Sequence, residues 1–219
     1  MNIIKTSDGS HSLLSGQLGV AYHSRHGAVQ ETRHVFIEAG LLHHRERSAL
    51  RVLEVGFGTG LNAFMTLLST QHRDVEVTYE TIEAFPITTA TAEALNFAEV
   101  LGVPENRAEF LRLHTSVWGK AIIFNNFTFI KHRTRLENFS SSEQFDVIYF
   151  DAFAPNAQPE LWEVPIFEQL YELLQPGGVL TTYCAKGVVK RTLRAVGFEV
   201  QALPGPPGKR EMTRAIRPA

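Results

Sequence analysis

The sequence predicts an α/β fold built on a parallel, doubly wound sheet. From residue 51 onward, apolar runs typical of strands alternate with stretches of helical periodicity, which is the pattern of repeated β–α–β units. The run 145–150 is nearly all apolar, as a central parallel strand covered on both faces should be. A glycine-rich turn at 56–60 joins the first strand to a helix. Ligands of such folds bind at the carboxyl ends of the strands.

Each element is predicted from its apolar pattern and its bounding turn residues. The expected strands cover residues 51–55, 75–82, 127–131, 145–150, 178–183, 198–202 and 212–216. The expected helices cover residues 59–68, 86–97, 107–118, 159–174 and 188–196. Residues 1–45 mix Gly, Ser and His with short β-like runs such as Val35-Phe36-Ile37. We interpret them as a β-rich N-terminal extension over the ligand end of a domain formed by residues 46–219.

Composition is that of one soluble globular domain, with 219 residues, 44% hydrophobic and 20% charged. No apolar run approaches the ~20 residues of a membrane helix, and the N-terminus lacks a signal-peptide pattern, so we expect a cytoplasmic protein with no membrane contact. Cys184 is the single cysteine, which excludes a disulfide framework and a cysteine-based metal site.

The charge is unevenly distributed along the chain. The net charge of −2 gives no global basic field. The segment 186–217, however, carries eight basic residues against only Glu199 and Glu211. This pattern fits either a solvated helix face or a surface that contacts a phosphate backbone.

The turn at 56–60 has the spacing G-x-G-x-G and follows the acidic residue Glu54. Glycines let the backbone adopt positive φ and approach a ligand closely, and the following helix directs its free N–H groups into the same space. The turn is neither G-x-G-x-x-G nor a phosphate loop. S-adenosylmethionine therefore fits better than NAD or ATP, with Glu54, Gly56, Gly58 and Gly60 as cofactor-binding candidates; a turn without a ligand is the alternative.

Glu83 follows the predicted strand 75–82, at the place where doubly wound folds hold the ribose hydroxyls with an acid. Glu80 is a weaker candidate because it precedes the strand end. A solvated acid is the alternative for Glu83.

Asp151 follows the strand 145–150 directly, so its carboxylate belongs in the ligand crevice, near the methyl group to be transferred. An alkylammonium has no lone pair, and an amine that accepts a methyl group must be held, deprotonated and aimed. Asp151 can attract the ammonium and orient the neutral amine, and Phe153 and Pro155 form a dry wall. A helix cap is the alternative for Asp151.

Blocks spread over nearly the whole chain resemble the tRNA 5-methylaminomethyl-2-thiouridine methyltransferases. They are E-T-R-H-V-F at 31–36, G-F-G-T-G-L-N at 56–62, D-A-F-A-P at 151–155, E-L-W at 160–162, L-Q-P-G-G-V-L-T-T-Y at 174–183, A-K-G-V-V-K-R at 185–191, G-F at 197–198 and G-K-R-E-M at 208–212. The glycine turn is generic to class I methyltransferases, whereas D-A-F-A-P and G-K-R-E-M together are specific.

The resemblance implies a class I fold with a seven-stranded sheet and methyl transfer from S-adenosylmethionine to the aminomethyl nitrogen of the wobble uridine in the tRNA anticodon loop. Asp151 matches the family's catalytic acid, and Asn62 belongs to the cofactor-binding block. Some relatives are fused to a flavin-dependent oxidoreductase that makes the amine. The chain resembles the stand-alone form, which implies a functional link to other enzymes that supply the precursor.

The remaining candidates follow from the resemblance and from charge. Tyr22 and Glu31 are expected at the methionine end of the cofactor. Phe153 or Trp162 is expected to stack on the flipped base. Contacts to tRNA phosphates are assigned to Lys186, Lys190, Arg191, Lys209 and Arg210. The nine histidines show no metal-ligand spacing, so we expect no metal.

One position departs from the family. Relatives carry an acid for the adenine amino group between the strands at 127 and 145, whereas this chain reads K-H-R-T-R-L-E at 131–137. Either Glu137 is recruited, or backbone groups and stacking hold the adenine. Two other functions stay open: methylation of a small-molecule amine, and a noncatalytic module that only binds a partner.

Overall fold

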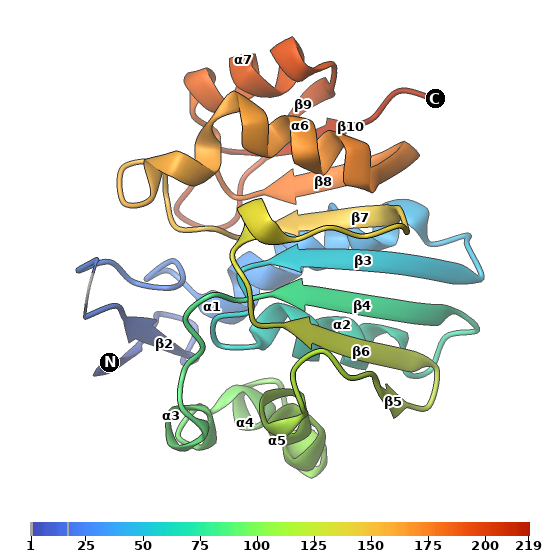
Figure 1. The fold of residues 1–219 in the computed structure, drawn as a ribbon. Coiled ribbons are helices and arrows are strands. Elements are labelled where there is room, and N and C mark those ends of the chain that lie inside the picture. The colour runs from blue at the N-terminus through green and yellow to red at the C-terminus, as the bar shows by residue number, and fades with distance from the viewer. Residues whose placement is uncertain (1, 17) are drawn as a thin grey trace.

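The computed structural model describes residues 2–16 and 18–219; residues 1 and 17 of the predicted extension lie outside them. Within the described chain, eight strands form one sheet in the order β5-β6-β4-β3-β7-β8-β10-β9 (Figure 1). The strands are β3 (Ala49–Val55), β4 (Glu76–Ile82), β5 (Ile122–Phe124), β6 (Phe127–His132), β7 (Phe145–Phe150), β8 (Leu174–Thr182), β9 (Glu199–Pro204) and β10 (Glu211–Ile216). From β6 to β8 all neighbours are parallel, whereas β5, β9 and β10 pair antiparallel. The doubly wound sheet is confirmed, and β5 is an additional edge strand beyond the expected seven.

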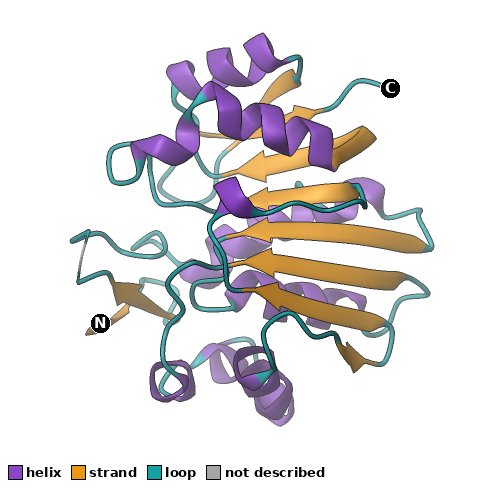
Figure 2. Ribbon diagram, viewed as in Figure 1, coloured by secondary structure: helices purple, strands orange, loops and turns teal. Residues whose placement is uncertain are grey.

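Helices cover both faces of this sheet (Figure 2). The α-helices are α1 (Ala28–Thr32), α2 (Leu61–Thr70), α3 (Thr89–Glu93), α4 (Phe97–Val100), α5 (Arg107–Thr115), α6 (Val164–Leu173) and α7 (Gly187–Val196). Shorter or irregular helical segments are η1 (Arg33–Glu38), η2 (Leu41–His44), η3 (Pro104–Asn106), η4 (Leu136–Asn138) and η5 (Pro159–Trp162).

Successive residues of the central strands pack into two separate hydrophobic cores. In β7, Tyr149 packs with Phe36 of η1 at a ring distance of 5.2 Å, in the core that also contains α1, α2 and α5. The next residue, Phe150, packs with Phe167 of α6 at 5.5 Å, in the core shared with α7. Because side chains alternate along a strand, β7 is apolar throughout and is buried along its whole length.

The N-terminal segment starts with an antiparallel hairpin of β1 (Asn2–Lys5) and β2 (His11–Leu14), which lies beyond the carboxyl ends of β3 and β4 (Figure 1). The β-like interpretation of residues 35–37 is wrong, because they lie in the helical segment η1. Val35, Phe36 and Ile37 are all buried, since η1 packs between α2 and β8. Burial on several sides overrides the strand propensity of these residues.

Two predicted helices are interrupted. The helix expected at 86–97 is divided into α3 and α4, because the Asn96 side chain leaves the helix to accept a hydrogen bond from His11 N–H and to donate one to Gly9 O. The helix expected at 159–174 consists of η5 and α6, each with a proline in its first turn and an extended residue, Glu163, between them. The end of that prediction, Leu174, belongs to β8.

No helix in residues 2–16 and 18–219 is long and apolar enough to cross a membrane.

Phe167→Ala is expected to lower the free energy of unfolding by about 3–5 kcal/mol, because the ring is fully buried against Phe150 and Trp162. Urea denaturation measures this loss. The control Ile123→Ala, at a side chain that is 66% exposed, is expected to change the value by under about 1 kcal/mol. Equal losses in the two variants would contradict the assigned packing.

Candidate active site

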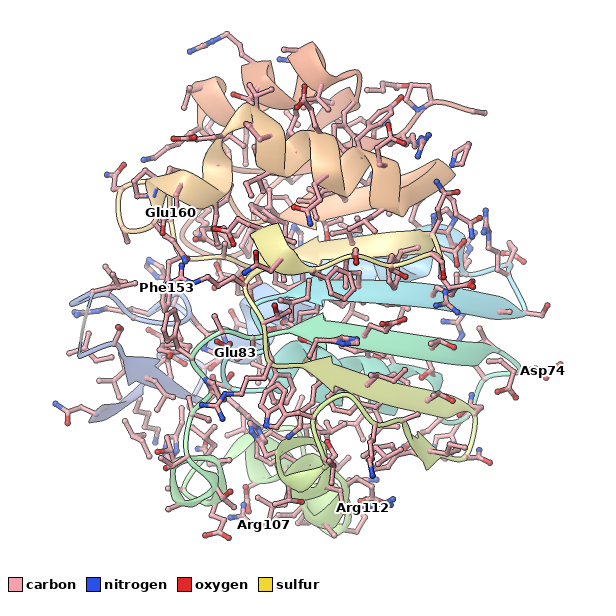
Figure 3. The ribbon with its side chains drawn as sticks, viewed as in Figure 1. Asp74, Glu83, Arg107, Arg112, Phe153 and Glu160 are labelled. Atoms are coloured by element: carbon pink, nitrogen blue, oxygen red, sulfur yellow. The ribbon has the colours of Figure 1, made fainter. Side chains whose placement is uncertain are left out.

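A cavity of about 870 Å³ opens at the carboxyl ends of the parallel strands. This volume lies within the range of about 300–1,000 Å³ that is typical of small-molecule sites. Figure 3 shows Glu83, Phe153 and Glu160 on this side of the molecule, and Asp74 at the opposite end of the sheet. The cavity brings together half of the residues predicted for the site: Tyr22, Glu31, Gly56, Gly58, Asn62, Glu83, Asp151, Phe153 and Lys209.

The glycine turn depends on the absence of side chains. Gly56 has φ +94°, and a Cβ there would lie 2.9 Å from the main-chain oxygen of Asp151. Gly58 has φ +49°, and its Cβ would lie 3.2 Å from the Tyr22 ring. Both positions combine left-handed backbone with close approach, which only glycine tolerates. The turn therefore packs directly against the strand tip that carries Asp151.

Glu83 is held at the tip of β4 by two main-chain donors. Gly58 N–H donates to Oε2 at 2.9 Å, and Phe85 N–H donates to Oε1 at 2.7 Å. Each carboxylate oxygen keeps a lone pair for a ligand hydroxyl. Glu80, in contrast, forms an ion pair with Arg51 and a hydrogen bond with His132 Nε2 at 2.8 Å. The structure thus brings Glu83 to the cavity, as the end of the strand predicts.

Asp151 is oriented by a chain of two side-chain hydrogen bonds. Asn62 Nδ2 donates to Asp151 Oδ2 at 2.8 Å, and Thr32 Oγ1 donates to Asn62 Oδ1 at 2.9 Å. The hydroxyl fixes the orientation of the amide, so Asn62 presents its N–H group to the carboxylate. The next helical segment after Asp151 begins at Pro159, which removes the helix-cap alternative.

The environment of Asp151 brings the pKa of its carboxyl group close to neutral pH. Burial raises the pKa of Asp151 from 3.8 to about 7, and the charge of Glu31 adds to this effect, while the hydrogen bond from Asn62 and the charge of Lys209 oppose it. A carboxylate with a pKa near neutrality can take a proton from a bound ammonium and release it to water. This is the property required of a general base.

Glu31 and Lys209 form an ion pair inside the cavity, although they are far apart in the sequence. Lys209 Nζ donates to Glu31 Oε1 at 2.6 Å, and Ser24 N–H donates to Oε2 at 2.8 Å. The ammonium also lies 4.0 Å from the centroid of the Tyr183 ring, whose hydroxyl donates to Ala152 O at 2.8 Å. Tyr183 is a site residue that sequence reasoning missed. Its place at the end of the predicted strand 178–183 was the available signal.

Aromatic and neutral side chains form the rest of the lining. Tyr22 and Phe153 contact edge to face, with ring centroids 5.0 Å apart. Burial, with the charge of Glu83 as a second cause, raises the pKa of Tyr22 to about 12, so its hydroxyl stays protonated. Burial also lowers the pKa of His23 to about 4, despite the charges of Glu31 and Asp8. His23 is therefore neutral at physiological pH.

Glu54 and Gly60 are not among the residues that line the cavity, and their contacts with the cofactor stay a prediction. Glu54 is 0% exposed and accepts a hydrogen bond from Thr81 Oγ1 at 2.7 Å. Burial raises its pKa well above the usual range. Gly60 packs toward His114, whose Nε2 would lie 2.7 Å from a Cβ at this position.

Trp162 and Pro155 are also not among the residues that line the cavity. Trp162 is 6% exposed, donates from Nε1 to Phe153 O at 2.8 Å and packs on the Phe150 ring. Trp162 thus supports the main chain that carries Phe153, and its stacking on a base stays a prediction. In the Pro155 turn, the neighbouring Ala154 and Ala157 line the cavity.

The basic candidates divide by environment. Lys186, Arg191 and Arg210 are exposed, as a phosphate-contacting surface requires. Lys190 is paired with Glu211 at 2.6 Å, and Lys209 lies inside the cavity. Two further arginines, Arg133 and Arg135, line the cavity.

The segment that lacks the adenine acid does reach the cavity. Its lining residues run from Arg133 to Glu137, and the Arg135 guanidinium lies 5.4 Å from the centroid of the exposed Phe85 ring. Both alternatives for adenine binding, Glu137 and stacking, are thus placed at this wall. In the part of the chain that the structure describes, no group of three His, Cys, Asp or Glu side chains is arranged to hold a metal ion.

Comparison with known proteins relates this geometry to a family. Residues 112–218 match the family model described as S-adenosyl-L-methionine-dependent methyltransferase. The structure superposes on MNMC2 from Aquifex aeolicus with a TM-score of 0.78 at 24% identity, covering 100% of this chain and 70% of that one. The chain has the fold of the class I S-adenosylmethionine-dependent methyltransferases.

Curated proteins similar to this chain confirm the family resemblance. The chain is 30% identical over 219 residues to the tRNA 5-methylaminomethyl-2-thiouridine biosynthesis bifunctional protein MnmC of Methylobacillus flagellatus, covering 90% of this chain and 32% of the relative. The protein of the same name from a Marinomonas species is 28% identical, with 91% and 31% covered. The chain spans about one third of the length of these relatives.

The residues present fit S-adenosylmethionine. Gly56 and Gly58 line the cavity with main chain alone, and Glu83 is anchored with acceptor capacity for two hydroxyls such as those of a ribose. The aromatic wall of Tyr22 and Phe153 provides the dry surface beside Asp151 that methyl transfer requires.

Glu83→Ala is expected to weaken the binding of S-adenosylmethionine by 30-fold or more, because two hydroxyl contacts and the anchor of Gly58 N–H are lost together. Isothermal titration calorimetry measures the affinity. Glu80→Ala serves as the matched control at the same strand and is expected to stay within about 3-fold. Equal losses would show that the cofactor does not use Glu83.

Asp151→Asn is expected to raise the stability of the protein at pH 8, but not at pH 4. The pKa of Asp151 is higher in the folded protein, so its protonated form favours folding, and this contribution is lost as the pH rises from about 4 through about 7. The variant lacks that loss. Urea denaturation across pH 4–8 should show a gain of about 4 kcal/mol that develops over this interval. A gain independent of pH would contradict the raised pKa.

Proposed function

We propose that this methyltransferase transfers a methyl group to the nitrogen of the 5-aminomethyl group on the wobble uridine, or 2-thiouridine, of tRNA. The observation that carries the proposal is Asp151, which lies in the cavity with a pKa near 7 and a fixed orientation. The names of the MnmC relatives supply the substrate class. The D-A-F-A-P and G-K-R-E-M blocks support the same assignment.

The chain's own groups prepare the amine. When bound, S-adenosylmethionine supplies an activated methyl group whose carbon forms a bond to the amine nitrogen as its bond to sulfur breaks. Asp151 accepts a proton from the substrate ammonium and thereby frees the lone pair of the nitrogen. Asn62 holds the carboxylate in place during this transfer, so one oxygen remains directed to the amine. Phe153 and Tyr22 exclude water from the reacting atoms.

The exposed basic residues supply the contact to RNA. Lys186, Arg191 and Arg210 are placed to neutralise phosphates, and Arg133 and Arg135 extend the positive surface to the cavity. In this proposal Phe153 stacks on the flipped base. Residues 1–45 act as an extension over the cofactor end, because Tyr22 and Glu31 line the cavity. A cytoplasmic location and a link to the enzymes that make the aminomethyl precursor follow from the same function.

The proposal predicts methyl incorporation from labelled S-adenosylmethionine into tRNA from cells that lack this activity. Nucleoside analysis should show conversion of 5-aminomethyluridine to 5-methylaminomethyluridine, and Asp151→Ala should be at least 100-fold slower, because the base is lost. Lys120→Ala, at an exposed lysine outside the cavity lining, is the control and should match the wild type.

Salt dependence separates the tRNA substrate from the alternative of a small amine, which the net charge of −2 leaves open. Several phosphate contacts give a steep fall in substrate affinity with rising salt, whereas a small amine gives a shallow one. A wild-type protein that binds the cofactor and labels no tRNA would favour the small amine. A protein that does not bind the cofactor would favour the noncatalytic module.

A further inference from the structure

The ammonium of Lys209 occupies a built cation site. Glu31 is 6% exposed, and its carboxylate faces Lys209 Nζ at 2.6 Å. On another side, the Tyr183 ring lies 4.0 Å from the same nitrogen. A carboxylate and an aromatic face are the two features that bind an alkylammonium in a partly dry site. Asp151 lines the same cavity, and the charges of Glu31 and Lys209 both act on its pKa.

The end of the lysine side chain is chemically the same group as the proposed substrate. Both are a primary ammonium on a methylene carbon, and such a group is protonated at neutral pH. We propose that Glu31 and the Tyr183 ring form the subsite for the substrate ammonium, and that Lys209 fills this subsite until the substrate displaces it. This inference rests on the proposed function, because it takes an alkylammonium as the substrate.

Of the two partners in this ion pair, only Lys209 is free to move when the substrate ammonium enters. Glu31 is fixed, since it lies in α1, is buried and accepts a main-chain hydrogen bond from Ser24. Lys209 extends from the turn between β9 and β10, and its side chain is 31% exposed. Its four-carbon stem can rotate out while the turn stays closed by the hydrogen bond from Gly205 N–H to Arg210 O.

Exchange of one ammonium for another keeps the buried charge balanced. An unpaired carboxylate at Glu31 would be costly, and the incoming ammonium replaces the pairing that Lys209 gives up. The substrate nitrogen then lies in the cavity that contains Asp151. A proton passes from that nitrogen to the Asp151 carboxylate, which leaves a neutral amine with its lone pair free.

The displaced lysine provides selectivity for an amine carried on RNA. Lys209 is adjacent to the exposed Arg210, so its released ammonium can pair with a backbone phosphate. A small amine carries no phosphate. The Lys209 ammonium that it displaces therefore moves into water without a new anionic partner. Lys209 is thus a specificity-determining residue that favours tRNA over free amines.

Binding of n-butylammonium to the full chain tests the subsite without any methyl transfer. Isothermal titration calorimetry should show at least 10-fold tighter binding to Lys209→Met than to the wild type, because the subsite is vacated while the aliphatic stem is kept. Lys120→Met is the matched control and should bind like the wild type. Adding Glu31→Gln to Lys209→Met should abolish the gain. Equal binding by Lys209→Met and wild type, or a gain that survives Glu31→Gln, would overturn the proposal.

A second variant, Lys209→Gln, keeps the test possible if Lys209→Met does not fold. Its amide still donates a neutral hydrogen bond to Glu31. It should show a smaller gain, and n-butylammonium should raise its melting temperature more than that of the wild type. No difference in either measurement would contradict the subsite.

Activity provides the second readout. The ratio of kcat/KM for tRNA to kcat/KM for the nucleoside 5-aminomethyluridine should fall at least 10-fold in Lys209→Met. A proportional loss on both substrates would assign Lys209 a merely structural role. If the wild type methylates neither substrate, the proposed function fails, and the binding experiment still decides whether Glu31 and Tyr183 form an ammonium subsite.

Discussion

Two main-chain hydrogen bonds at the tips of the central strands hold the active site together. Gly56 N–H donates to Ile82 O at 3.0 Å, and Asp151 N–H donates to Val55 O at 3.1 Å. They extend the ladders of β3 with β4 and β7 one residue beyond the strands. The glycine turn, Glu83 and Asp151 are thereby fixed relative to one another by the sheet itself. The cofactor site and the proposed catalytic base are therefore held in place by the most buried part of the fold.

The cavity must also satisfy its own charges, since Asp151, Glu31 and Lys209 lie close together in a partly dry space. Burial and, after it, the charge of Glu31 raise the pKa of Asp151 to about 7, and the lysine offsets part of this effect. Burial also raises the pKa of Glu54 well above its usual range. Of these two carboxyl groups, only that of Asp151 lines the cavity, whereas Glu54 is fully buried.

Local pattern was sufficient for the sheet and for the residues at its strand tips. β7 was predicted with its observed bounds, and Glu83 and Asp151 were found because the end of a parallel strand has a known position in the fold. Local pattern failed where a distant contact decides the outcome. Residues 35–37 are helical because they are buried on several sides. Trp162 lies in the core, where its Nε1 donates a hydrogen bond to Phe153 O. The partner of Lys209 lies 178 residues away, which no local signal reveals.

That separation has a consequence for the order in which the protein is built. Glu31 is made early in synthesis and Lys209 is made 178 residues later, so the early chain holds an acidic side chain whose partner does not yet exist. Contacts of such sequence separation form late, because closing the long intervening loop costs entropy. The parallel strands from β3 to β8 and the glycine turn can assemble before the hairpin of β9 and β10 has been made. The cavity wall that contains the ion pair is therefore completed after the strand tips that carry Glu83 and Asp151.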